Sequence, residues 1–175
     1  QKNTMVYTNA PTASEKQTML IREEIDEINQ FIQRHRGWTN TYFLDQIETG
    51  DHANQYIFRL FVNGFPVYWK DSDIGNFPDT MQFQVVSGSI NKYARSLYFL
   101  SNEVVKHSQI ATPNKDQLLS LIKQRGIDLN HVKRVYLSYQ AIPEPNQKVS
   151  LTPCWVVETG NGKIHYLSTS SKEEN

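Results

Sequence analysis

The sequence predicts an α+β fold in which a helix packed on an antiparallel β-sheet occurs twice. Two segments show helical spacing of apolar residues, with start and stop signals at their ends. Several other segments alternate with a period of two and are separated by turn residues. Because the order of helix followed by strands repeats along the chain, we expect a duplicated unit.

The first predicted helix runs from about Ser14 to His35. The patterns Thr12-x-x-Glu15 and Ser14-x-x-Gln17 both fit a capping box. Gly37 supplies a left-handed stop at the other end. Apolar residues recur every three or four positions along one stripe, namely Leu20, Ile21, Ile25, Ile28, Phe31 and Ile32.

The acidic residues of this helix are interpreted as a solvated face rather than as a metal or acid-base cluster. They are Glu23, Glu24, Asp26 and Glu27.

A second, shorter helix is predicted to begin with Thr112 as its cap and Pro113 at its first helical position. Gly126 ends it. Its apolar residues are Leu118, Leu119, Leu121 and Ile122.

The clearest hairpin signal lies at Tyr56–Val62, Asn63-Gly64 and Phe65–Trp69. Asn-Gly fits a type I′ turn because both residues tolerate positive φ, and the flanking β-branched and aromatic residues suit strands. Pro66 indicates an edge position or a strand end.

Six further strands are predicted, each bounded by turn residues, and the last three read as an antiparallel meander after the second helix. They are Thr41–Ile47, Met81–Ser87, Lys92–Leu100, Val132–Ala141, Val149–Val157 and Lys163–Leu167.

These elements predict two units joined by a linker. Residues 12–100 form the first helix-plus-sheet unit and 112–168 the second helix-plus-meander unit. Residues 1–11 are a leading strand or linker, 101–111 a linker, and 169–175 a disordered polar tail.

Composition argues against several classes of function. The 175 residues carry 18 Lys plus Arg and 18 Asp plus Glu, so their formal charges cancel. Without a net positive charge, the chain has no general electrostatic attraction for the phosphate backbone of nucleic acids. The lone cysteine, Cys154, cannot form an internal disulfide or a thiolate zinc site, and is expected to be a small buried residue. No apolar run is long enough for a membrane span. The chain starts at Gln1 without an apolar leader, so we expect a processed or partial product.

Motifs for chemistry are weak. None of the five histidines lies three or four residues from another, and G-x-S-x-G, P-loop and G-x-G-x-x-G patterns do not occur. The segment Asp71–Asp79 resembles a calcium loop but lacks a terminal Glu at the required spacing. We therefore predict no catalytic residue, no cofactor and no metal, and hence no enzyme.

Tyr68 and Trp69 are the candidate partner-interface residues. As neighbours in a strand they point to opposite faces, so one of them is expected to point away from the helix-covered side. Two interpretations stay open: an edge aromatic packed under a loop, or a surface for a partner, since Tyr and Trp are favoured in interface cores.

Five segments resemble the YycH family of regulatory proteins. They are His35–Thr39, Phe58–Val67, Tyr93–Leu97, Val135–Tyr139 and Leu151–Trp155, and the resemblance covers about residues 5–168. The related YycI family is the second choice. Two residues depart from the family pattern: Ser96 replaces its usual Pro, and Arg36 replaces a commoner Gly.

The resemblance implies a non-enzymatic, extracytoplasmic regulatory domain on the bacterial cell membrane. Such a protein is anchored by an N-terminal transmembrane helix outside this chain. With a YycI-like protein it modulates the WalK sensor histidine kinase, which controls cell-wall metabolism in Gram-positive bacteria. The alternative is an extracellular module that binds a cell-wall glycan or peptide. A glycan site would need an exposed aromatic platform beside clustered amides, and a hydrolase would need groups assembled from distant segments.

Overall fold

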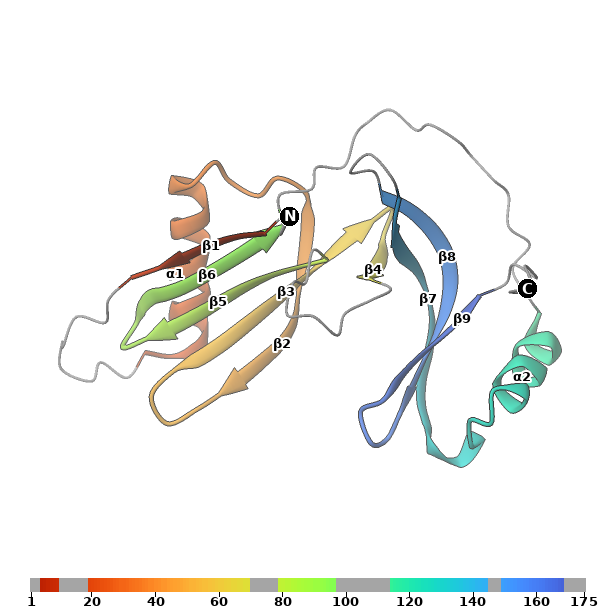
Figure 1. Ribbon diagram of the computed structural model, residues 1–175. Helices are drawn as coiled ribbons and strands as arrows, with labels where there is room; N and C mark the ends of the chain where they lie inside the picture. Colours follow the sequence, from red (N-terminus) through yellow and green to blue (C-terminus); the bar gives the residue numbers. More distant parts are fainter. Residues whose placement is uncertain (1–3, 10–18, 70–78, 97–113, 145–148, 169–175) are drawn as a thin grey trace. The chain divides into compact units, whose positions relative to one another are not determined.

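The computed structural model describes residues 4–9, 19–69, 79–96, 114–144 and 149–168. The chain divides into two compact units, Gln1–Gly64 with Asp71–Ser101 and Phe65–Lys70 with Asn102–Asn175. The described residues are mostly strands, with two α-helices (Figure 1). The predicted α+β class is confirmed, while the duplication of a helix-on-sheet unit stays a prediction.

Unit 1 contains a five-stranded antiparallel sheet in the order β1-β6-β5-β3-β2. Its strands are β1 (Thr4–Thr8), β2 (Thr41–Thr49), β3 (Asn54–Val62), β5 (Thr80–Val86) and β6 (Ser89–Ser96). The strands expected at Thr41–Ile47 and Met81–Ser87 are therefore present. β6 begins three residues before the expected Lys92, and residues 97–100 of that prediction lie outside the described residues.

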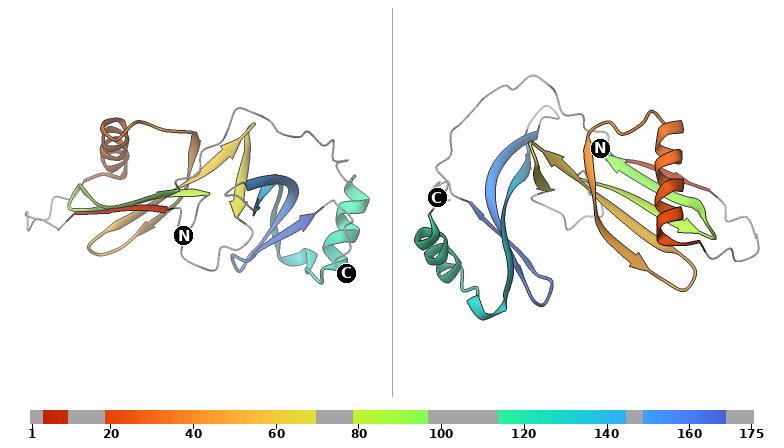
Figure 2. Two further views of the ribbon diagram at one scale, coloured as in Figure 1. Left: turned by 45° about the horizontal axis from the view of Figure 1, so that its top comes forward. Right: turned by 180° about the vertical axis from the view of Figure 1, so that it is seen from behind.

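Helix α1 (Ile21–Arg34) covers one face of this sheet (Figure 2). Its buried stripe of Ile28, Phe31 and Ile32 packs on buried side chains of β3, β5 and β6. The ring of Phe31 lies 5.5 Å from that of Tyr93 and 6.5 Å from that of Phe83. This apolar layer is the core of unit 1.

The start of α1 differs from the prediction. The helix begins at Ile21, and the carboxylate of Glu23 accepts a hydrogen bond from the N–H of Leu20 at 2.8 Å. Thr12 and Ser14, the expected caps, lie outside the described residues. Leu20 and Ile21, where the predicted apolar stripe begins, are exposed, and the first buried apolar residue of the helix is Ile28.

The end of α1 agrees with the prediction, and a second residue there, Arg36, also has a positive φ. Gly37 is left-handed, with φ +72°, and its N–H donates to the Ile32 carbonyl at 2.9 Å. Arg36 is also left-handed, at φ +79°. A non-glycine residue therefore occupies a position that glycine normally takes in this type of helix end.

The prediction that the acidic residues of α1 form a solvated face is wrong for Glu24, which is buried. Its carboxylate accepts hydrogen bonds from Asn54 Nδ2 at 2.8 Å and from the Tyr56 hydroxyl. Glu24 lies four residues before Ile28 and seven before Phe31, so helical spacing places it on the buried stripe.

Two turns of unit 1 use left-handed residues. Asn63 and Gly64 have φ of +50° and +82°, so the predicted two-residue turn is confirmed. The β5–β6 turn, which was not predicted, uses Ser87 and Gly88 at φ +48° and +76°. Met19 packs directly over Gly88, where a Cβ atom would lie 2.1 Å from the Met19 sulfur.

Unit 2 contains a four-stranded sheet in the order β4-β7-β8-β9. Its elements are β4 (Phe65–Trp69), α2 (Lys115–Gln124), the 3-10 helix Leu129–His131, β7 (Val132–Pro143), β8 (Val149–Thr159) and β9 (Ile164–Ser168). β7, β8 and β9 form the predicted antiparallel meander. β4 pairs with β7 in parallel, which the local sequence pattern does not indicate.

Helix α2 packs on this sheet through a core of Ile122, Ile127, Val157 and Leu167. Its predicted cap is corrected: Asn114 accepts from the N–H of Gln117 at 3.0 Å, and the Gln117 side chain accepts from the N–H of Asn114 at 2.9 Å. Thr112 and Pro113 lie outside the described residues. Gly126, at φ +67°, ends the helix as predicted.

Candidate partner interface

Strand β4 of unit 2 carries both candidate residues. It lies beside β7, with Tyr68 opposite Gln140 and Trp69 opposite Ala141. Successive residues of a strand point to opposite faces of the sheet. Tyr68 and Trp69 therefore belong to two different environments, which are described in turn.

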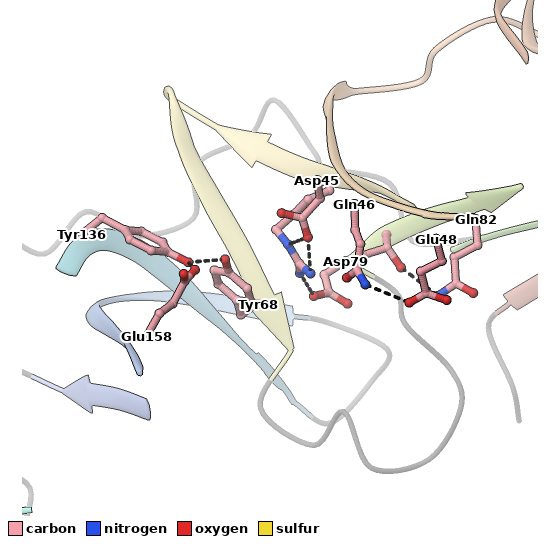
Figure 3. A network of polar contacts seen from close by, with 10 residues as sticks. Asp45, Gln46, Glu48, Tyr68, Asp79, Gln82, Tyr136 and Glu158 are labelled. Atoms are coloured by element: carbon pink, nitrogen blue, oxygen red, sulfur yellow. Dashed lines mark hydrogen bonds and ion pairs between the residues drawn. The ribbon is translucent and has the colours of Figure 1, made fainter. Parts of the chain in front are cut away.

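Tyr68 is buried and hydrogen bonded. It is 6% exposed, and its hydroxyl oxygen lies 2.5 Å from that of Tyr136 on β7 (Figure 3). Its ring also lies 5.5 Å from the ring of Tyr166 on β9. These contacts hold β4 against the meander.

The polar chain continues from Tyr136 to Glu158 on β8. The Tyr136 hydroxyl donates to Glu158 Oε1 at 2.7 Å, so Tyr68 donates to Tyr136. The second oxygen of Glu158 accepts from Arg134 Nε at 2.8 Å. Burial and then the neighbouring Tyr68 and Glu158 raise the pKa of Tyr136, which keeps this phenol neutral as a donor.

Trp69 lies on the other face of β4. It is half-buried, and strand alternation places Phe65, which is 39% exposed, on the same face. The Phe65 ring makes an edge contact with Tyr139 at 6.2 Å between centroids. We call Phe65, Trp69 and Tyr139 the β4 aromatic face.

Phe65 and Tyr139 were missed at the sequence level. The period-two pattern of β4 already links Phe65 to Trp69. Tyr139 joins them only through the parallel pairing of β4 with β7, in which it lies opposite Val67. Large, partly exposed aromatic residues of this kind are enriched at protein interfaces.

A charge network lies in unit 1. Arg59 on β3 donates from Nε to Asp45 at 2.8 Å and from Nη1 to Asp79 at 2.6 Å (Figure 3). Asp45 occupies the point where the β2–β3 register shifts between Leu44 and Gln46. The network ties the irregular part of β2 to β3 and to the residue that precedes β5.

The possible calcium loop is only partly described. Its last residue, Asp79, is buried and bound to Arg59, whereas 71–78 lie outside the described residues. Within the described part of the chain, no three His, Cys, Asp or Glu residues are grouped so that they could hold a metal ion.

Unit 1 also carries a row of amides on the sheet face opposite α1. The register aligns Gln46, Ile57 and Gln82, and next to them Glu48, Gln55 and Gln84. Gln46 donates to Glu48 at 2.8 Å. The rings of Phe43 and Phe61 lie 4.7 Å apart, and Phe43 is exposed. We call this side of the sheet, with Gln46, Gln55, Gln82, Gln84 and the ring of Phe43, the amide face.

Cys154 is buried, as predicted. Its sulfur lies 3.1 Å from the Ser138 hydroxyl oxygen, and burial raises the pKa of the thiol. A thiol in this setting is a packing group rather than a nucleophile. None of the helices in the described ranges is long and apolar enough to cross a membrane.

Comparison with known proteins gives one family match. The family model described as the YycH protein, C-terminal domain, matches residues 1–174. No curated protein sequence matches the chain.

Two solved structures are similar to this chain, and the first of them supports the fold. The crystal structure of YycH from Bacillus subtilis matches with a TM-score of 0.61 and 20% identity, over 97% of this chain and 40% of that one. The YpeB C-terminal domain of Bacillus megaterium matches with a TM-score of 0.43 and 14% identity, over 88% and 68% of the two chains. This chain therefore spans about two fifths of the YycH structure that it matches.

Proposed function

Because the chain belongs to the YycH family, as its C-terminal domain, we propose that it is a non-enzymatic regulatory domain of a WalK sensor kinase system. The match over residues 1–174 is the observation that carries this proposal. In the proposed arrangement the domain lies on the extracytoplasmic side of the membrane, and a membrane anchor belongs to another part of the protein. Its partners are a YycI-like protein and the kinase ectodomain, and the process regulated is cell-wall metabolism in a Gram-positive bacterium.

The β4 aromatic face is the proposed contact for the YycI-like partner. Trp69 and Phe65 offer partly exposed aromatic surface, which contributes strongly to affinity when a partner buries it. Tyr68 supports this surface from the other side of the strand, because its hydroxyl is tied to Tyr136. In this proposal Trp69 contacts the partner and Tyr68 positions the strand.

Regulation then follows from differential binding. A kinase that exchanges between two signalling states shifts toward the state that its partner binds better. A difference of about 1–3 kcal/mol in binding free energy is sufficient for a clear regulatory effect. No bond needs to be made or broken in the accessory protein.

The test is kinase activity in a reconstituted membrane. The sensor kinase, the YycI-like protein and the full-length YycH-family protein are placed in vesicles, and the rate of kinase autophosphorylation is measured. A second preparation carries the same accessory protein without this domain. We expect the two preparations to differ by at least several-fold, and equal rates would refute a regulatory role for the domain.

A second candidate function is binding of a cell-wall glycan or peptide, and the amide face favours it. Amide side chains on the same sheet face as the exposed Phe43 ring combine hydrogen-bonding groups with apolar surface, as binding sites for sugar or peptide chains do. Soluble cell-wall fragments that protect the amide face from hydrogen exchange would support this alternative. Fragments that leave exchange unchanged would exclude it.

A further inference from the structure

One end of unit 2 gathers cationic side chains, although the formal charges of the whole chain cancel. Lys123 lies in the last turn of α2 and Arg125 caps that helix. Lys133 and Arg134 lie at the start of β7, and Lys163 directly precedes β9. All five side chains are exposed. Three segments that are distant in the sequence therefore contribute positive charge to the same end.

Hydrogen bonds hold these segments together. The N–H of Gly160, in the β8–β9 turn, donates to the carbonyl of His131 in the 3-10 helix at 2.8 Å. Within the turn, the Asn161 side chain accepts from the N–H of Lys163 at 3.1 Å. The end of α2, the start of β7 and the β8–β9 turn accordingly lie at one end of unit 2 (Figure 1).

The acidic side chains at this end already have partners. Segments 123–135 and 158–164 contain two carboxylates, Asp128 and Glu158. Asp128 accepts from His131 Nδ1 at 2.9 Å, and Glu158 accepts from Arg134 Nε at 2.8 Å. No ion pair links the other four cations to a residue in the described ranges; they are Lys123, Arg125, Lys133 and Lys163. These four charges face solvent without a neutralising partner among those residues.

Apolar side chains are exposed among the cations. Of the four large apolar side chains that are exposed in the described part of unit 2, three lie at this end. They are Leu129, Val135 and Ile164, which are 38%, 36% and 38% exposed. A soluble polyanion would contact the charges alone, whereas a lipid bilayer offers phosphate groups and an apolar layer directly beneath them. Basic and apolar side chains together match a bilayer.

We propose that this end of unit 2, which we call the basic end, docks on the surface of an anionic lipid bilayer. The four cations contact the phosphate groups, and Leu129 and Ile164 enter the boundary between headgroups and acyl chains. A chain without net charge is compatible with this role, because at physiological salt only charges within about 8 Å of the surface act on it strongly.

The basic end is separate from the β4 aromatic face. Along β7, Lys133 lies six residues before Tyr139, which corresponds to about 20 Å in a strand. A domain docked on lipid through the basic end therefore keeps Phe65 and Trp69 available to a protein partner. The lipid proposal does not depend on the identity of that partner.

The first experiment measures sedimentation of the chain with lipid vesicles. One set of vesicles mixes phosphatidylglycerol with phosphatidylcholine, and the other contains phosphatidylcholine alone. Partitioning into the anionic vesicles should be at least about five-fold stronger and should fall as salt is added. Equal partitioning into the two sets would overturn the proposal.

Charge variants locate the surface. A triple variant with Lys123→Gln, Lys133→Gln and Lys163→Gln should lose partitioning into anionic vesicles, by about five-fold for each charge removed. Far-UV circular dichroism verifies that the variant is folded, as expected for three exposed positions.

A matched triple variant removes the same net charge elsewhere. Its substitutions are Arg22→Gln, Lys92→Gln and Lys115→Gln, all at exposed positions outside the basic end. This variant should partition as the unmodified chain does. Equal losses in the two triple variants would show that only the net charge of the chain matters, and would overturn the proposal.

Apolar variants distinguish lipid from a soluble polyanion. Leu129→Ser with Ile164→Ser should weaken partitioning into anionic vesicles at least about five-fold, because the apolar contact is lost. Binding of soluble polyphosphate should not change in this double variant. Leu20→Ser with Ile21→Ser, at exposed positions of unit 1, should leave partitioning unchanged. Full partitioning of the Leu129 and Ile164 double variant would indicate attraction to phosphate alone and would refute docking on lipid.

Discussion

Glu24 of α1 accepts a hydrogen bond from the hydroxyl of Tyr56 on β3, inside the buried layer between helix and sheet. Asn54, also on β3, donates a second bond to the same carboxylate oxygen at 2.8 Å. Apolar contacts alone permit some sliding of a helix on a sheet, whereas this arrangement has defined donors and one acceptor. We infer that Glu24 fixes the position of α1 along β3.

The first prediction concerns this carboxylate. Glu24→Ala leaves the Tyr56 hydroxyl and the Asn54 amide without their acceptor in a buried site. The free energy of unfolding should fall by about 2–4 kcal/mol, as measured by urea denaturation. Asp26→Ala, at an exposed position of the same helix, should change it by less than about 0.5 kcal/mol. Equal effects of the two substitutions would show that Glu24 has no special role.

The second prediction concerns alkaline pH. The pKa of Tyr136 is raised by burial and by Tyr68, and the pKa of Tyr56 by burial and by Glu24. The folded state therefore holds these protons more tightly than the unfolded state, where a tyrosine titrates near pH 10. Their stabilising effect is complete below about pH 10 and is lost as the pH rises further.

The measurement is the urea midpoint between pH 9 and pH 11, for the unmodified chain and for Tyr136→Phe. The midpoint of the unmodified chain should decline above about pH 10, and the decline should be shallower in the variant. Parallel declines in the two proteins would contradict the environment described for Tyr136.

The third prediction concerns Arg36, which has φ +79° after the last turn of α1. Glycine adopts this conformation without the steric cost that a Cβ atom brings. Arg36→Gly should raise the free energy of unfolding by about 1 kcal/mol. Arg36→Ala removes the charged side chain but keeps the Cβ atom, so it should give no gain. A gain in both variants would assign the effect to the charge instead.

The fourth prediction compares two turn glycines. Gly64 has φ +82°, and Gly64→Ala should destabilise the chain by about 1–2 kcal/mol although no atom lies near the new methyl group. Gly160 does not have a positive φ, and its Cβ would meet only the His131 carbonyl at an ordinary 3.8 Å. Gly160→Ala should therefore be nearly neutral. Thermal unfolding of the two variants checks this difference.

Local signals in the sequence predict much of the fold. The Asn63-Gly64 turn, the stop at Gly126 and the period-two strands depend on residues close together in the chain, and the structure confirms them. The predicted start of α1 was wrong because the sequence offers polar capping patterns before Ile21, where the helix begins. The contact at that start, from the N–H of Leu20 to the carboxylate of Glu23, involves no hydroxyl cap of the kind that the prediction used.

The candidate site depends on contacts between distant residues. The pairing of β4 with β7 brings Tyr68 to Tyr136, 68 positions later, and nothing in either segment marks the partner. The same holds for Glu24 and Tyr56, which are 32 positions apart. The helical spacing of Glu24 indicates that it faces the sheet, although its partners emerge only in the folded chain.

Calorimetric titration against the purified ectodomain of a YycI-like protein tests the proposed function most directly. The chain should bind saturably with one-to-one stoichiometry. Trp69→Ala should weaken binding at least ten-fold, whereas Gln124→Ala, on the exposed end of α2, should bind as the unmodified chain does. No saturable binding at matched ionic strength would contradict the assignment of this domain as a partner-binding regulator.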